Sequence, residues 1–105
     1  MNFSVDINCD MGEGVGNDEL IMPCITSANI ACGYHAGGEE TMKQTILLAK
    51  QYKVNIGAHP SFLDKENFGR TEIKTSPSEV YELVSTQIKI LQKIAEENNA
   101  ALHHV

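Results

Sequence analysis

The chain has 105 residues, of which 42% are hydrophobic and 21% charged, and its formal net charge is −6. This length supports one domain with a core of its own, and the acidic balance argues against nucleic acid or an anionic membrane as partner. No hydrophobic run approaches the ~20 residues of a membrane span, and the N-terminus does not resemble a signal peptide, so we expect a cytoplasmic protein. Its three cysteines lack C-x-x-C spacing and are expected to be reduced thiols.

Residues 5–10 predict the first strand, because hydrophobic and polar side chains alternate along them. The hydrophobic side chains, expected to face a core, are Val5, Ile7 and Cys9. The polar side chains, all acidic or amide groups, are Asp6, Asn8 and Asp10. The glycine-rich loop 12–16 follows and adds the carboxylate of Glu13. Carboxylates crowded at a strand end repel one another unless a cation, a proton or a donor-rich ligand lies among them. The stretch therefore predicts either a functional site or a solvated edge strand.

The next segments alternate helices and strands. Residues 17–22 predict a short helix that Pro23 ends, and residues 25–32 predict a strand in which small side chains dominate. Residues 39–53 predict a helix, because hydrophobic residues recur every three to four positions and the charges at both ends suit the helix dipole. Residues 54–59 predict a third strand.

The last third of the chain predicts a long helix after a polar loop at residues 61–75. Ser76 is expected to cap the helix 77–97, and Glu79 to complete a capping box. Residues 100–105 predict the start of a fourth strand.

This order of elements predicts an α/β fold with about four parallel strands. Two closed arrangements are compatible with it: a flavodoxin-like sandwich, or part of a (β/α) barrel. Polar residues on consecutive strands suit the lined mouth of a barrel better than a sheet covered on both faces. Because a complete barrel runs ~250 residues, residues 1–105 are expected to form a single, incomplete β/α-barrel domain.

Metal-ligand residue types end three successive predicted strands: Asp10 with Glu13, then His35, then His59. The carboxyl ends of parallel strands meet at one edge of the sheet, so these side chains are expected to converge. Two imidazoles and a carboxylate can hold a hydrolytic metal, which makes Asp10, His35 and His59 the predicted ligands of a divalent ion. The alternative is that each histidine hydrogen-bonds a backbone carbonyl group.

Three further features have weaker functional interpretations. The loop 12–16 lacks the Gly-Lys-Ser/Thr ending of a P-loop and contains an acid that would repel a phosphate. Arg70 is either a clamp for a substrate carboxylate or a solvated loop residue. Cys32, near His35, is expected to be an inert buried thiol rather than a nucleophile.

Motifs along the whole chain closely resemble those of the LamB/YcsF family, the A subunit of bacterial 5-oxoprolinase. They are, in order, Asp6-x-Asn8-x-Asp10-x-Gly12-Glu13-Gly14, Gly16-Asn17-Asp18, Thr26–Gly37, Gly57-Ala58-His59-Pro60-Ser61 and Phe68-Gly69-Arg70. The resemblance implies an irregular β/α barrel of the glycoside hydrolase/deacetylase type. It also implies hydrolysis of 5-oxo-L-proline (pyroglutamate) to L-glutamate with ATP, and Mg by implication, together with separate B and C subunits.

The resemblance also frames the expected roles of the site residues. The expected catalytic residues are Asp10, Glu13, His35 and His59. The expected substrate-binding residues are Asp6, Asn8, Asn29 and Arg70. Phosphorylation of the amide oxygen by ATP would create a leaving group, and a carboxylate would then activate water. Two alternatives are a metal-dependent deacetylase of the same superfamily and a non-catalytic half-barrel module.

The family continues beyond the segment that matches residues 102–105, so the chain is expected to be a truncated form or a fragment. An incomplete barrel leaves a sheet edge and a hydrophobic face open, and we expect such a chain to self-associate.

Overall fold

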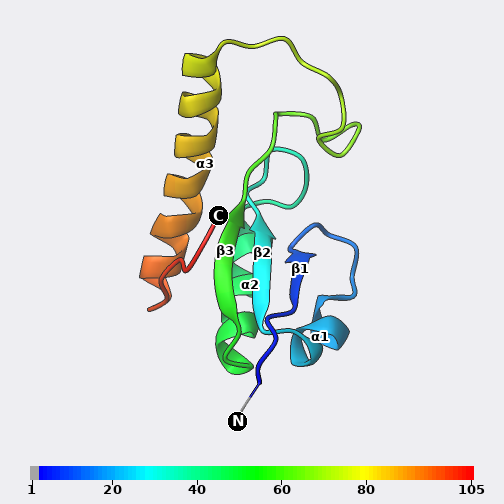
Figure 1. The fold of residues 1–105 in the computed structure, drawn as a ribbon, viewed down its shortest axis with the longest axis vertical. Helices are drawn as coiled ribbons and strands as arrows, with labels where there is room; N and C mark the ends of the chain where they lie inside the picture. The colour runs from blue at the N-terminus through cyan, green and yellow to red at the C-terminus, as the bar shows by residue number, and fades with distance from the viewer. Residues whose placement is uncertain (1–2) are drawn as a thin grey trace.

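A three-stranded parallel sheet, in the order β1-β2-β3, forms the centre of the computed structural model, which describes residues 3–105. The elements along the chain are β1 (Asn8–Met11), α1 (Asp18–Ile21), the 3-10 turn η1 (Met22–Cys24), β2 (Ser27–Ala31), α2 (Glu39–Gln51), β3 (Asn55–His59) and α3 (Pro77–Glu97). Figure 1 shows α2 behind the sheet and α3 alongside β3, with the C-terminal segment running between α3 and β3. No helix within residues 3–105 is long and apolar enough to cross a membrane.

The strands and helices predicted at 25–32, 39–53, 54–59 and 77–97 are confirmed, with ends that differ by at most two residues. The short helix predicted at 17–22 ends at Ile21, and the chain continues through one 3-10 turn that contains Pro23. The predicted α/β fold with parallel strands is therefore confirmed.

The strand predicted at residues 100–105 is present only as a single parallel bridge between His104 and Gly57. Two hydrogen bonds make it: the His103 N–H donates to the Ile56 carbonyl at 2.7 Å, and the Ala58 N–H donates to the His104 carbonyl at 3.0 Å. The part of the chain that the structure describes thus has three strands and a single bridge that begins a fourth.

The prediction that Val5 and Ile7 face the core is wrong. β1 begins at Asn8, and Val5 and Ile7 are 75% and 53% exposed. The pairing of β1 with β2 begins at Asn8 opposite Ser27, so residues 5–7 precede the paired part of the sheet and lie outside its packed face. Met11, at the other end of β1, takes the core position instead and is only 1% exposed.

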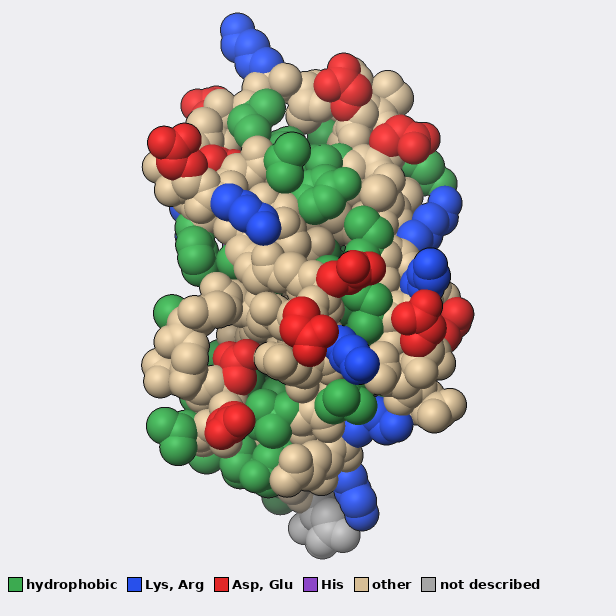
Figure 2. Space-filling model, turned by 180° about the vertical axis from the view of Figure 1, so that it is seen from behind, with side chains coloured by type: hydrophobic (Ala, Val, Ile, Leu, Met, Phe, Trp, Pro, Cys, Tyr) green, Lys and Arg blue, Asp and Glu red, His purple; other side chains and the backbone are tan. Residues whose placement is uncertain are grey.

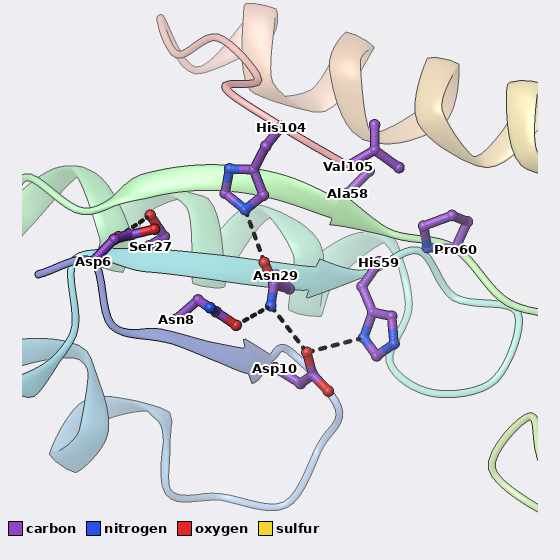
Figure 3. Close-up of a pocket in the computed structure, with 10 residues that line it drawn as sticks. All are labelled: Asp6, Asn8, Asp10, Ser27, Asn29, Ala58, His59, Pro60, His104 and Val105. Carbon is purple, nitrogen blue, oxygen red and sulfur yellow. Dashed lines mark hydrogen bonds and ion pairs between the residues drawn. The ribbon is translucent and has the colours of Figure 1, made fainter.

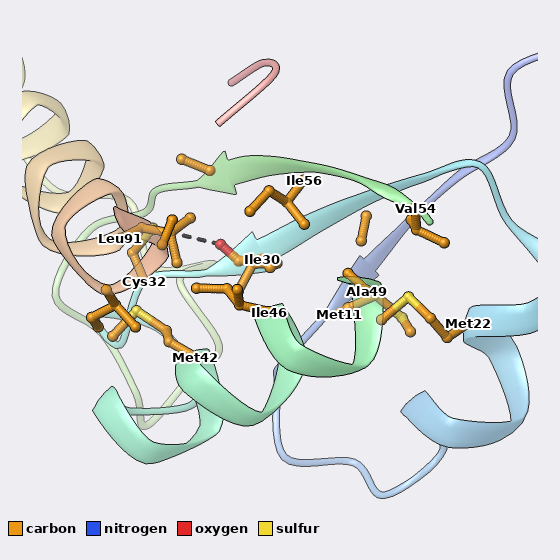
Figure 4. Close-up of a cluster of buried hydrophobic side chains, with 14 residues drawn as sticks. Met11, Met22, Ile30, Cys32, Met42, Ile46, Ala49, Val54, Ile56 and Leu91 are labelled. Atoms are coloured by element: carbon orange, nitrogen blue, oxygen red, sulfur yellow. Dashed lines mark hydrogen bonds between the residues drawn. The ribbon is translucent and has the colours of Figure 1, made fainter. Parts of the chain in front are cut away.

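The hydrophobic core lies between one face of the sheet and the two long helices (Figure 4). Side chains that alternate along β2 and β3 point into it, because successive strand residues face opposite sides. The core consists of Met11, Met22, Ala28, Ile30, Cys32, Met42, Ile46, Ala49, Val54, Ile56, Ala58, Leu91, Ile94 and Ala95. Packing of α2 and α3 on this face leaves the opposite, polar face of the sheet open.

The predicted cap of α3 is confirmed in its main feature. The Glu79 N–H donates to the Ser76 hydroxyl oxygen at 3.2 Å, which satisfies a free donor of the first turn. The Glu79 carboxylate accepts hydrogen bonds from the hydroxyl groups of Ser76 and Thr75, at 3.1 and 2.9 Å. It therefore fixes the helix start through side chains, and not through the backbone N–H that a capping box uses.

Gln87, on α3, ties the chain after β3 to this helix. Its side chain is fully buried; its Oε1 accepts from the Ser61 N–H at 2.9 Å, and its Nε2 donates to the Ser61 carbonyl at 2.7 Å. Nε2 also donates to the Leu83 carbonyl at 3.0 Å. Ser61 lies two residues after His59, so this clamp fixes the start of the loop 61–75 close to the end of β3.

Candidate active site

The polar face of the sheet forms a groove of about 390 Å³ whose lining includes Asn8, Asp10, Ser27, Asn29 and His104 (Figure 3). Asn29 lies at its centre. Its Nδ2 donates to Asn8 Oδ1 at 3.0 Å and to Asp10 Oδ1 at 3.2 Å, and its Oδ1 lies 2.8 Å from His104 Nε2. The face of the molecule shown in Figure 2, opposite to the view of Figure 1, shows no histidine side chain of residues 3–105.

Asp6 lies in the same groove, before the start of β1. Its Oδ1 accepts hydrogen bonds from the hydroxyl groups of Thr26 and Ser27. The Thr26 bond, and then the Ser27 bond, hold the pKa of Asp6 below its ordinary value. Asp6 thus attaches the N-terminal segment to β2.

The side chains predicted to converge at the strand ends do lie together. Glu13 is in the loop after β1, His35 is in the loop after β2, and His59 is the last residue of β3. Glu13 Oε1 lies 3.6 Å from His35 Nε2 and 3.5 Å from His59 Nδ1. Asp10 joins the group from β1, with its Oδ1 3.7 Å from His59 Nδ1. These residues border a second cavity, of about 310 Å³, together with Arg70.

Direct contact between two loops holds Glu13 near His35. Gly12 and Gly37 both have positive φ angles, of 71° and 72°, a conformation that favours glycine. A Cβ atom at Gly37 would collide with the carbonyl oxygen of Gly12. Only a residue without a side chain therefore allows these two loops to approach so closely.

Three ring nitrogens of the two histidines are buried and have no hydrogen-bond partner, although the His59 ring as a whole is partly exposed. His35 is 3% exposed, and neither of its ring nitrogens has a partner; His59 Nδ1 also has none. Their rings lie edge to face, with centroids 4.7 Å apart. A buried polar atom without a partner costs free energy, so an arrangement of this kind is typical of a site that receives a ligand.

The donor set fits a divalent metal ion. One ligand atom from each of Glu13, His35 and His59 lies within 4.8 Å of the other two. Ligand atoms bound to tetrahedral zinc lie about 3.3 Å apart, close to the two distances from Glu13 Oε1. Asp10, which the sequence suggested as the carboxylate ligand, is 55% exposed, whereas Glu13 is 13% exposed. The geometry therefore favours Glu13 as the ligand, with Asp10 beside it.

Arg70 makes no ion pair with any residue in the range 3–105, and its side chain is exposed at the border of the second cavity. Phe68, two residues earlier, packs edge to face on His35 with ring centroids 5.7 Å apart. The loop 61–75 therefore brings a free guanidinium group to the edge of the histidine cluster.

Cys32 belongs to the core rather than to the site. It is 2% exposed, and burial raises the pKa of its thiol to about 11, so the thiol stays protonated at neutral pH. This agrees with the expected inert thiol.

His104 is a site residue that the sequence interpretation did not include. It reaches the groove by lying across β3 at Gly57, where an added Cβ atom would collide with its ring. A glycine inside a strand often marks the close approach of another group, so Gly57 is the signal that could have indicated it.

The chain belongs to the LamB/YcsF family, whose profile matches residues 5–105. It is 48% identical to the 5-oxoprolinase A subunit of Staphylococcus carnosus, over 98% of this chain and 43% of that protein. It is 46% identical to the 5-oxoprolinase A subunit of Bordetella pertussis, over 100% of this chain and 44% of that protein.

Among solved structures, the fold matches the crystal structure of the lactam utilization protein from Thermus thermophilus. The TM-score is 0.95 at 42% sequence identity, over 98% of this chain and 44% of that one. The chain thus spans less than half the length of these relatives.

Proposed function

We propose that this chain contributes part of the active site of a 5-oxoprolinase A subunit, which opens the lactam ring of 5-oxo-L-proline to give L-glutamate. The reaction depends on ATP, and the A subunit works with separate B and C subunits. The observation that carries the proposal is the cluster of Glu13, His35 and His59, with its unpartnered imidazole nitrogens, at the carboxyl ends of the strands. The names of the relatives support the same reaction.

The residues around the cluster suit the hydrolysis of an amide. Asp10 lies beside His59 with an exposed carboxylate, and we assign it to position a water molecule and accept its proton. Arg70 binds the carboxylate of the substrate, which its guanidinium group matches with two hydrogen bonds. Asn8 offers an amide group to the lactam from the neighbouring groove. Asp6, whose Oδ1 accepts from two hydroxyl groups, has a smaller part in binding.

Glu13, His35 and His59 are the residues that would hold a divalent metal. When bound, such an ion supplies Lewis-acid polarisation of a carbonyl oxygen. Without a metal, His35 Nε2 and His59 Nδ1, which both lie within 3.6 Å of Glu13 Oε1, are free to carry a proton and to stabilise the negative charge that develops on the amide oxygen.

Residues 12–18 do not fit the phosphate groups of ATP. The Gly12 N–H already donates to Asp18 Oδ2 at 2.9 Å, and Glu13 and Asp18 bring negative charge to the loop. A phosphate cradle needs free N–H groups and a cation. We therefore assign ATP binding to another part of the enzyme and derive no step from this loop.

The test is glutamate formation from 5-oxo-L-proline by the complete A subunit with this sequence, assembled with the B and C subunits. Asp10→Asn should lower turnover by ~100-fold, the scale expected for the loss of a positioned acid or base, while the fold is retained. Glu96→Gln removes an exposed carboxylate at the far end of α3 and should leave turnover unchanged. Near wild-type turnover of Asp10→Asn would refute the role of Asp10.

A second candidate, a metal-dependent amide hydrolase that does not use ATP, is favoured by the same cluster. Stoichiometric bound zinc, together with hydrolysis of an acetylated amide in the absence of ATP, would support this candidate over the first.

A further inference from the structure

One row of residues runs across the polar face of the sheet and leads to Asp10. Asp10 pairs with Asn29, Asn29 pairs with Gly57, and Gly57 pairs with His104. Since Gly57 has no side chain, the His104 ring lies across it and reaches Asn29 (Figure 3). Hydrogen bonds therefore connect the side chains of Asp10, Asn29 and His104, which belong to three segments far apart in sequence.

The chemistry of these groups fixes the direction of every hydrogen bond in the row. A carboxylate accepts hydrogen bonds only, so the group of Asn29 that lies 3.2 Å from Asp10 Oδ1 is its NH₂ group. The same NH₂ group donates to Asn8 Oδ1 at 3.0 Å. The amide oxygen of Asn29 must then face His104, 2.8 Å away, and this oxygen can only accept. The proton of that bond therefore belongs to His104 Nε2.

We propose that His104 and Asn29 are positioning residues that hold the Asp10 carboxylate in its working orientation. The part of the inference that concerns turnover rests on the proposed function of Asp10. His104 locks the amide of Asn29, and Asn29 holds Asp10 Oδ1 on the side that faces His59. The second oxygen of Asp10 is left to accept a proton from water. In this proposal Asn29 acts through Asp10 rather than on the substrate, because both N–H bonds of its amide are already used.

His103 supports this arrangement at the other side of the imidazole. Its Nδ1 lies 3.1 Å from Nδ1 of His104. Neutral His104 carries its proton on Nε2, so its Nδ1 accepts from His103.

The first test uses the unmodified protein and does not depend on activity. Nitrogen NMR of the ¹⁵N-histidine-labelled complete A subunit should show neutral His104 as the Nε2–H tautomer. The Nδ1–H tautomer would overturn the proposal, because Nε2 could then not donate to Asn29.

The second test compares two variants of His104 in the assembled enzyme. His104→Phe keeps a ring over Gly57 but loses the donor, and it should lower kcat by about tenfold with little change in KM, the scale for loss of a residue that orients a catalytic group. His104→Gln keeps an N–H donor and should restore most of the lost turnover. Equal turnover of the two variants, whether wild-type or reduced, would show that the donor does not matter and would refute the proposal. If the wild-type enzyme itself makes no glutamate, the proposed function fails, while the tautomer measurement still decides on His104.

Discussion

Replacing Gln87 by leucine should destabilise the protein more than any change of similar size on the outer face of α3. The leucine side chain has nearly the same volume but cannot bond to Ser61, which loses a partner for its N–H at 2.9 Å and for its carbonyl at 2.7 Å. An unsatisfied buried donor or acceptor costs about 1–3 kcal/mol. Ser61 is only partly buried and so regains some water contact. We therefore expect the free energy of unfolding to fall by about 2–4 kcal/mol.

Urea unfolding followed by circular dichroism measures this difference, and an unchanged m-value would show that the two states are otherwise comparable. The matched control is Gln92→Leu, an exposed glutamine on the same helix, which should change the free energy of unfolding by no more than about 0.5 kcal/mol. If the two variants unfold at the same urea concentration, the clamp contributes nothing and the reasoning is wrong.

Four other measurements test the site and the fold. Glu13→Gln should abolish zinc binding in calorimetry whereas Asp10→Asn should retain it, and the reverse order would restore Asp10 as the ligand. Alkylation of the native protein should modify exposed Cys24 and spare Cys32, as read by mass spectrometry. Because burial raises the folded pKa of Cys32 from 9.0 to about 11, its contribution to stability is complete below pH 9 and is lost as pH rises through about 11; a flat pH dependence there would contradict this. The 105-residue chain should self-associate in light scattering, most simply as a dimer, because β1 pairs on one side only; a stable monomer at high micromolar concentration would argue against an open sheet.

Short sequence patterns predicted the elements whose formation depends on residues close together in the chain. The cap at Ser76 and the hydrophobic stripe after it are sufficient to place α3. The rule that parallel strands end at one edge was sufficient to group Glu13, His35 and His59.

The features that the sequence did not reveal depend on contacts between distant segments. Gln87 bonds to Ser61 across 26 positions, and His104 bonds to Asn29 across 75 positions, so no short window contains either pair. The preference for Glu13 over Asp10 as the proposed metal ligand follows from the conformation of the loop after β1, which contact with another loop determines. The start of β1 depends on where β2 begins to pair with it, and alternation alone does not give that boundary.

The contact between Gly37 and the Gly12 carbonyl holds the two loops together without the reactive side chains of Glu13 and His35. It joins backbone to backbone, so exchanging the side chains at positions 13 and 35 does not remove it. Because this contact involves only the backbone, it does not depend on a ligand, and it lowers the ordering entropy that binding has to supply. A lineage that keeps the two glycines can therefore change the reactive groups on these loops, and with them the reaction, without rebuilding the scaffold that presents them.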